Sequence, residues 1–156
     1  STPYPILEAN KKRTTFVKVS LTGFTMSAST RATVNVAIVL DKSGSMSGDK
    51  IEKAKAAAIN AVNRLQANDI LSVLAYDNGV QVLIPATKIS DKKSIIEAIN
   101  RLTADGGTAL FAGVSKGAAE VRKFLKKESV NRVILLSDGQ ANQGPSSPAE
   151  LGELGA

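Results

Sequence analysis

Short apolar runs alternate along the chain with segments of helical period. Residues 34–40 are β-branched and almost uncharged, as expected of a strand that is buried on both faces. Residues 70–76 and 132–136 form similar runs, and helical patterns lie between them. Strands that alternate with helices favour a parallel sheet covered by helices. We therefore predict an α/β domain with a doubly wound, Rossmann-like, mostly parallel sheet.

Three segments have the period of amphipathic helices. The first begins at Asp49, which has the spacing of a capping box with Glu52, and ends at residues 68–69. The second begins at residues 90–91, and the third runs from about Ala109 to Lys126. The apolar stripe of the third helix consists of Leu110, Val114, Ala118, Val121 and Leu125.

Two further strands are antiparallel or accessory. The turn signal at residues 77–79 predicts that residues 80–84, closed by Pro85, form a strand antiparallel to the one before it. Residues 14–24 alternate between apolar and polar positions, which indicates a half-buried strand. We assign residues 1–30 to an N-terminal arm with this accessory strand, and residues 31–156 to the main domain. Residues 147–150 have the pattern of a helix start, and the sequence ends inside that helix.

The composition excludes several kinds of chemistry. The chain has 156 residues without Cys or His, so it holds no disulfide, no thiol nucleophile, no Ser-His-Asp triad and no His-ligated zinc. The net charge is +6, but the basic residues are scattered and aromatic residues are few, so we expect no nucleic-acid partner. No apolar stretch is long enough to span a membrane. The first residue is Ser1, which favours an upstream segment that has been removed.

Oxygen-bearing side chains lie at the ends of three of the predicted elements. Asp41, Ser43 and Ser45 come directly after the first buried strand, Thr108 opens the third helix, and Asp138 follows the last strand. Alternate residues of an extended segment face the same side, and strand ends of this kind meet at the switch point of a doubly wound sheet. Oxygen ligands of this type suit Mg²⁺, and also Mn²⁺ or Ca²⁺.

Each piece alone has an ordinary alternative. Asp41 and Ser43 suit a helix-entry loop, Asp138 with Gly139 suits a strand-end turn, and Thr108 suits the N-cap of the third helix. Together they describe a site in which two carboxylates balance a divalent cation. Hydroxyls are weak donors, so such an ion remains able to accept a carboxylate from a partner.

The motif and its flanks resemble a known family. Residues 39–46 (Val-Leu-Asp-Lys-Ser-Gly-Ser-Met), 106–108 (Gly-Gly-Thr) and 137–142 (Ser-Asp-Gly-Gln-Ala-Asn) are similar to the metal-ion-dependent adhesion site (MIDAS) of von Willebrand factor type A domains. The resemblance covers residues 33–156 and is strongest to bacterial members, often of the cell envelope. It implies that hydroxyls contact the metal, that aspartates bind it directly or through water, and that an Asp or Glu of a partner protein completes the coordination. It also implies an extracytoplasmic location.

The family's strand order is 3-2-1-4-5-6, with two strands after the last aspartate. This sequence has only a helix start there, so the sheet is expected to lack its last strands. A shortened chain, a disordered remainder or a second polypeptide that supplies the missing strands would each explain this. The fourth strand would then lie at an uncovered edge.

Three functions compete. The first is a non-enzymatic, metal-dependent protein-binding module, whose rim includes Lys42, Met46, Gly107 and Gln140; Met46 suits loop packing better than contact. The second is a Mg²⁺-dependent phosphotransferase or hydrolase with Asp41 as nucleophile. It lacks a second acid at position 43 and a phosphate-binding glycine loop. The third is one fragment of an assembly that another chain completes by strand addition.

Overall fold

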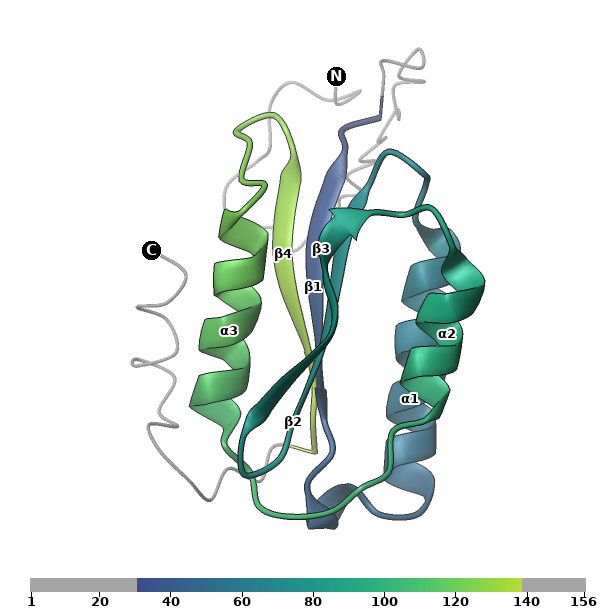
Figure 1. Ribbon diagram of the computed structural model, residues 1–156, viewed down its shortest axis with the longest axis vertical. Helices are drawn as coiled ribbons and strands as arrows, with labels where there is room; N and C mark the ends of the chain where they lie inside the picture. The colour runs from purple at the N-terminus through teal and green to yellow at the C-terminus, as the bar shows by residue number, and fades with distance from the viewer. Residues whose placement is uncertain (1–30, 139–156) are drawn as a thin grey trace, which may run out of the picture. The chain divides into compact units, whose positions relative to one another are not determined.

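The computed structural model describes residues 31–138. Its elements follow the predicted alternation of strands and helices (Figure 1). In chain order they are β1 (Val34–Asp41), the short 3₁₀ helix η1 (Gly44–Met46), α1 (Asp49–Arg64), β2 (Ile70–Tyr76), β3 (Val80–Lys88), α2 (Lys92–Asn100), α3 (Leu110–Arg122) and β4 (Val130–Leu136). The predicted strand 14–24 and the predicted helix start at 147–150 lie outside the described residues.

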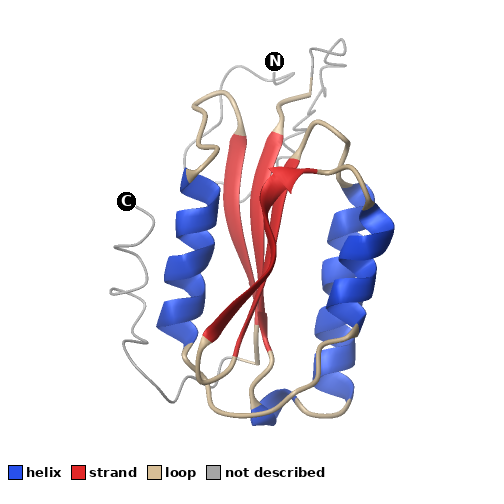
Figure 2. Cartoon of the chain, viewed as in Figure 1, coloured by secondary structure: helices blue, strands red, loops and turns tan. Residues whose placement is uncertain are grey.

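The four strands form one sheet in the order β3-β2-β1-β4. β1 is parallel to both β2 and β4, and β3 is antiparallel to β2. This confirms the predicted mostly parallel, Rossmann-like topology. The three parallel strands end at the same edge of the sheet (Figure 2), where ligands of open α/β sheets bind.

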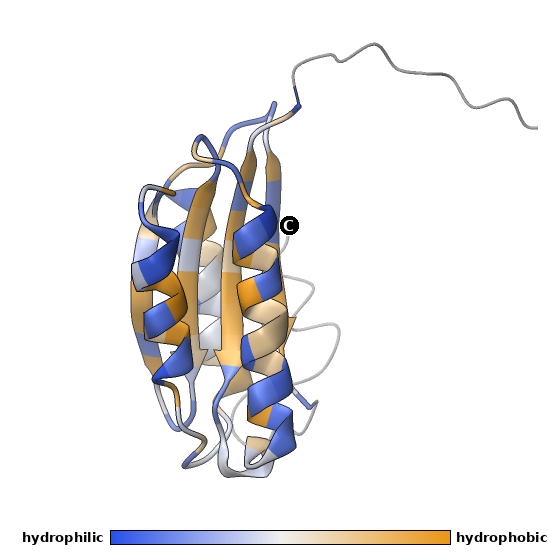
Figure 3. Ribbon diagram, turned by 90° about the vertical axis from the view of Figure 1, so that its right-hand side faces the viewer, coloured by the Kyte–Doolittle hydropathy of each residue, from blue (hydrophilic) through white to orange (hydrophobic). Residues whose placement is uncertain are grey.

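Helices cover both faces of the sheet, and β1 lies between them. In Figure 1, α1 and α2 lie on one side and α3 on the other. The strands are mainly apolar in Figure 3, whereas the helices alternate between apolar and polar positions. All residues of β1 after the first are buried, which explains its continuous apolar pattern. Each fully buried Val, Leu or Ile stabilises the fold by about 1.5–3 kcal/mol relative to an exposed one.

Two glycines allow α3 to lie close to the sheet. A Cβ atom on Gly113 would be 2.7 Å from Cδ1 of Tyr76, and one on Gly117 would be 2.7 Å from Cγ2 of Val39. A glycine inside a helix costs roughly 0.5–1 kcal/mol relative to alanine, which the close packing offsets. The predicted stripe is wrong at Leu125, which is 62% exposed because α3 ends at Arg122.

Several element ends differ from the prediction. The capping box is wrong, because Gly48, with φ of 74°, is the N-cap of α1 and Asp49 is its first helical residue. Glu52 instead accepts a hydrogen bond from Lys55 Nζ (2.9 Å). α1 also ends at Arg64 rather than at residues 68–69.

β3 continues through Pro85 to Lys88 instead of ending at the proline. Pro85 is tolerated because β3 is an edge strand of the described sheet. The next amide, of Ala86, donates to Oε2 of Glu120 on α3 (2.9 Å). The register of β3 against β2 shifts in this region, as expected where a bulge interrupts the ladder.

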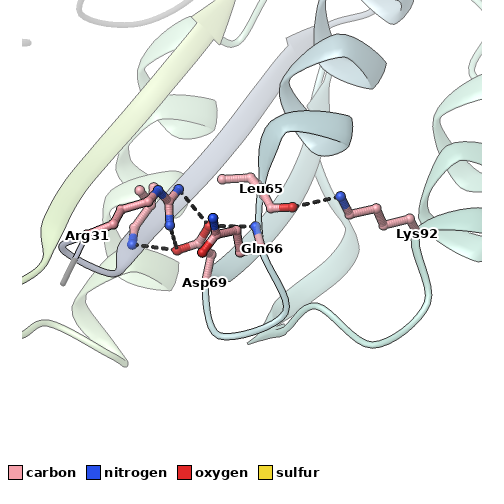
Figure 4. Close-up of polar contacts among 6 residues, drawn as sticks. Arg31, Leu65, Gln66, Asp69 and Lys92 are labelled. Atoms are coloured by element: carbon pink, nitrogen blue, oxygen red, sulfur yellow. Dashed lines mark hydrogen bonds and ion pairs between the residues drawn. The ribbon is translucent and has the colours of Figure 1, made fainter. Parts of the chain in front are cut away.

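The start of β1 is held by a buried carboxylate. Asp69 accepts two hydrogen bonds from the guanidinium of Arg31, both of 2.9 Å, and one each from the amides of Val34 and Gln66, both of 2.8 Å (Figure 4). Burial alone would raise the pKa of Asp69, but the hydrogen bonds from Arg31, Gln66 and Val34 bring the pKa below its ordinary value. The carboxylate therefore joins the start of β1 to the α1–β2 loop.

A lysine completes the end of α1. Lys92 Nζ donates to the carbonyls of Asn63 (2.9 Å) and Leu65 (2.7 Å), and Figure 4 shows the second of these bonds. The last carbonyls of a helix have no partner within it, and a cation is favoured there by the helix dipole. This contact ties α2 to the end of α1.

β4 lies at one edge of the described sheet and keeps apolar side chains at the surface. Val130, Ile134 and Leu135 are 40%, 39% and 37% exposed. Among the described residues β4 pairs with β1 alone; the expectation that the fourth strand has an uncovered edge stays a prediction.

Candidate metal centre

Asp41 is the last residue of β1 and is fully buried. Its Oδ1 accepts a hydrogen bond from the amide of Ser43 (2.9 Å), and its Oδ2 accepts from the hydroxyls of Tyr76 (2.9 Å) and Ser137 (2.8 Å). The parallel register pairs Asp41 with Tyr76, so the strand pairing itself sets this contact. All of these donors are neutral groups.

Ser43 and Ser45 bring two hydroxyls together beside Asp41. The Oγ atoms of the two serines are 3.1 Å apart. Ser43 is buried and Ser45, on η1, is exposed. The alternation predicted from the sequence therefore places two oxygens at one point, where the site meets the surface.

The loop that carries Thr108 is tied to the loop after β1. The amide of Gly44 donates to the carbonyl of Gly106 (2.9 Å), and the amide of Asp105 donates to the carbonyl of Lys42 (2.7 Å). Gly106 has φ of +81°, which favours glycine because other residues rarely adopt it. These bonds bring the two predicted ligand segments side by side.

Thr108 itself is 1% exposed. The N-cap of α3 is Ala109, whose own side chain makes no capping hydrogen bond. The N-cap position, which the ordinary alternative gave to Thr108, is therefore held by Ala109. The adjacent amide of Ala109 donates to the carbonyl of Asp77 (2.6 Å), which fixes the start of α3 to the β2–β3 turn.

Asp138 lies two residues beyond β4, whose last residue pairs with the residue before Asp41. Its Oδ2 accepts a hydrogen bond from Lys50 Nζ (2.8 Å), and its side chain is 11% exposed. Sequence reasoning missed Lys50 as a member of this region. Its position in the first turn of α1, where a cation opposes the helix dipole, was the available signal.

The rim residues differ in their roles. Lys42 does not extend freely into solvent, because its Nζ forms an ion pair with Asp77 and its side chain is 17% exposed. That contact holds the pKa of Asp77 below its ordinary value, with help from the Gly79 amide. Met46 is buried in the core on the α1 face, and the amide of Gly107 donates to Asn78 Oδ1 (2.9 Å). The remaining rim candidate, Gln140, lies outside the described residues.

Tyr76, the last residue of β2, is fully buried. It is also the hydroxyl donor to Asp41, which the sequence did not reveal. Burial raises the pKa of Tyr76 far above its ordinary value, and the charge of Asp41 raises it further. The phenol therefore remains a proton donor to Asp41 at neutral pH.

The chemistry of the gathered groups suits a hard cation. Within residues 31–138, no group of three or more His, Cys, Asp or Glu side chains is arranged to hold a metal ion. A cation at this edge would therefore depend on serine and threonine hydroxyls beside the two aspartates. Such an oxygen set fits Mg²⁺, Mn²⁺ or Ca²⁺.

The same geometry makes Asp41 a poor nucleophile. Its carboxylate is buried, and both oxygens accept hydrogen bonds. A nucleophile must reach the reacting atom and be activated by a neighbouring group. Within residues 31–138, the groups that contact the Asp41 carboxylate are an amide and two hydroxyls, which do not supply such activation.

A doubly wound sheet with serine hydroxyls and aspartates at the carboxyl ends of its parallel strands β1 and β4 defines a class of oxygen-lined sites. The comparisons with known proteins specify the family. Residues 36–140 match the von Willebrand factor type A domain, and the chain belongs to this family. Domains of this family commonly mediate protein–protein interaction and commonly bind a divalent metal at an adhesion site; they are typically not enzymes.

Individual relatives agree. Protein sll0103 of Synechocystis sp. is 39% identical over 114 residues, which are 73% of this chain and 27% of that protein. A von Willebrand factor type A structure from Catenulispora acidiphila has a TM-score of 0.66 at 28% identity, over 79% of this chain and 30% of that one. The N-terminal domains of the pilus tip protein Mfa5 from Porphyromonas gingivalis have a TM-score of 0.56 at 25% identity, over 70% and 20% of the two chains.

The chain thus spans less than a third of each of these relatives. Among the residues described here, no helix is long and apolar enough to cross a membrane.

Proposed function

We propose that this chain is a metal-dependent protein-binding module. A divalent cation held by Asp41, Ser43, Ser45, Thr108 and Asp138 captures an exposed Asp or Glu of a partner protein. The module has no catalytic role of its own. The family match and the convergence of the ligand segments support the proposal.

The observation that carries it is the charge of Asp41. This carboxylate is fully buried, yet the donors that the structure gives it are an amide and two hydroxyls. Buried charges in proteins are paired with an opposite charge or bind a metal. The two lysines nearest in sequence, Lys42 and Lys50, form ion pairs with other aspartates. An external cation would supply the missing charge.

Mg²⁺ is the ion we propose, with Mn²⁺ or Ca²⁺ as alternatives. Two carboxylates balance a divalent charge, and Mg²⁺ commonly binds through one or two carboxylates while it keeps exchangeable positions. A hydroxyl-rich set leaves the ion able to attract a further anion, which suits capture of a carboxylate.

The test uses two surfaces that differ by one functional group. One displays the capped peptide Gly-Asp-Gly at high density, and the other displays Gly-Asn-Gly. We expect the chain to bind the first surface in Mg²⁺, to lose this binding in EDTA, and to ignore the second in both conditions. Asp138→Ala should abolish binding while the far-UV circular dichroism stays the same. Equal binding of wild type and Asp138→Ala in Mg²⁺ would refute the proposal.

A second proposal concerns assembly. The exposed apolar side chains of β4 and its position at an edge of the described sheet favour pairing with a further strand. That strand would come from a longer form of this protein or from a second chain. Amide hydrogen exchange tests this, because the β4 amides should become protected when the partner segment is added. Unchanged exchange in β4 would count against strand addition.

The phosphotransferase alternative has a direct assay. We expect no steady release of p-nitrophenol from p-nitrophenyl phosphate in Mg²⁺; release that depends on Asp41 would revive this alternative. The cellular location is a separate proposal. The likeness to a pilus tip protein supports an extracytoplasmic location for this chain.

A further inference from the structure

The metal site has a cationic neighbour that neither the motif nor the sequence pattern includes. Lys50 is the second residue of α1, and its Nζ lies 2.8 Å from Oδ2 of Asp138. Its side chain is 51% exposed. A cation in the first turn of a helix opposes the helix dipole, so helix stability does not explain this lysine.

Lys50 lies on the rim of a pocket beside the site. The pocket has a volume of about 410 Å³ and lies between α1 and the end of β4. Lys53, Leu136 and Asp138 line it together with Lys50. The ammonium group therefore has space next to the carboxylate, and it approaches the site from the side on which Asp138 lies.

We propose that Lys50 is a specificity-determining residue of the metal site, which holds Asp138 in the metal-free protein and donates to the partner's carboxylate in the complex. The inference rests on the proposed function. The inference is based on competition between two cations for the carboxylate of Asp138. A divalent cation bound to Asp138 would repel the ammonium group of Lys50. The half-exposed side chain then turns toward the other negative group at the rim, the incoming Asp or Glu.

This role predicts opposite changes in two affinities. At low ionic strength, Lys50→Met should bind Mg²⁺ about three- to tenfold more tightly, because a nearby positive charge has been removed. At saturating Mg²⁺ the same variant should bind the Gly-Asp-Gly surface about three- to tenfold more weakly, since a charge-assisted hydrogen bond is lost. A lysine with a merely structural role would not produce this opposition.

Two variants control the experiment. Lys53→Met removes the same charge one turn nearby on the same rim, and both of its affinities should change less than about twofold, as expected of a screened surface charge. Lys50→Arg keeps the charge and should restore both affinities toward wild type. Thermal unfolding of each variant in EDTA verifies that the fold is intact.

The outcomes separate the two proposals. If wild type binds neither Mg²⁺ nor the peptide surface, the proposed function fails and this inference fails with it. If wild type binds both, but Lys50→Met changes them in the same direction or no more than Lys53→Met does, the inference alone is overturned. Opposite shifts in Lys50→Met, with rescue in Lys50→Arg, support it.

Discussion

Two buried aspartates near the two ends of β1 are satisfied in different ways. Asp69, beside the start of the strand, accepts hydrogen bonds from the Arg31 guanidinium and from two amides. Asp41, at the end of the strand, accepts from one amide and two hydroxyls. Both are fully buried, but only Asp69 has a cation among the donors that the structure gives it.

The difference distinguishes a structural carboxylate from a binding carboxylate. The charge of Asp69 is matched within the protein, so removing it should harm the fold. Among the described residues, the donors to Asp41 are neutral dipoles, and we propose that an external cation balances its charge. Burial alone would not have separated the two residues; the identity of their donors does.

The largest expected effect comes from making the same substitution at both positions. Asp69→Asn turns an amide NH₂ toward donors that cannot accept a hydrogen bond, so we expect a loss of about 2 kcal/mol or more in the free energy of unfolding. Asp41→Asn can keep its oxygen on the Ser43 amide and direct its NH₂ to the Tyr76 and Ser137 hydroxyls. In EDTA it should cost less than about 1 kcal/mol.

Urea unfolding of the two variants and of wild type in EDTA measures these values. Equal destabilisation of Asp41→Asn and Asp69→Asn would contradict the distinction between a structural and a binding carboxylate.

An intermediate effect is expected where α3 touches Tyr76. In Gly113→Ala the new Cβ would lie 2.7 Å from the Tyr76 ring, so the ring or the helix must move, at a cost of about 1–3 kcal/mol. Because the Tyr76 hydroxyl donates to Asp41, Mg²⁺ affinity should fall as well. Urea unfolding and calorimetry measure the two effects.

Gly79→Ala is the matched control, since a Cβ there meets nothing within 4 Å. A Gly113→Ala variant as stable as this control would show that α3 and the Tyr76 ring leave room for a Cβ atom at position 113.

The smallest effect concerns Glu120, another buried acid with an internal cation. It accepts from Lys123 Nζ (2.6 Å) and from the Ala86 amide. Burial would raise its pKa, but these hydrogen bonds bring the pKa below its ordinary value of 4.5. The stabilisation is therefore complete above about pH 4.5 and is lost as the pH falls through the lowered folded-state pKa.

Glu120→Gln should lower the free energy of unfolding at pH 7 by about 1 kcal/mol and flatten its decline in acid. Unfolding followed at a series of pH values tests this, with the exposed Glu128→Gln as control. If the free energy of unfolding of Glu120→Gln falls as steeply in acid as that of wild type, other carboxylates cause the fall.

The residue pattern predicted the mostly parallel sheet, and the resemblance to a known family supplied the strand order. The run at 34–40 identified a strand covered on both faces, and the turn at 77–79 identified the antiparallel pair. The positions of Asp41 and Asp138 after buried strands predicted that both lie at the carboxyl edge of the sheet. These features depend on local pattern and on topology, which sequence records directly.

Contacts that depend on register were not predictable in the same way. The bond from Tyr76 to Asp41 follows from the pairing of two parallel strands, and the Lys50–Asp138 pair joins positions 88 residues apart. The capping box failed because glycine with positive φ can begin a helix without a side-chain cap. Pro85 did not end β3 because an edge strand can do without one amide.

The proposed function rests on the binding of a cation at Asp41. Calorimetric titration of Mg²⁺ into wild type and into Asp41→Asn at low ionic strength tests this. We expect one binding event in wild type and none in Asp41→Asn, with both proteins equally folded in EDTA. Equal Mg²⁺ binding by the two proteins, or no binding by wild type, would contradict it.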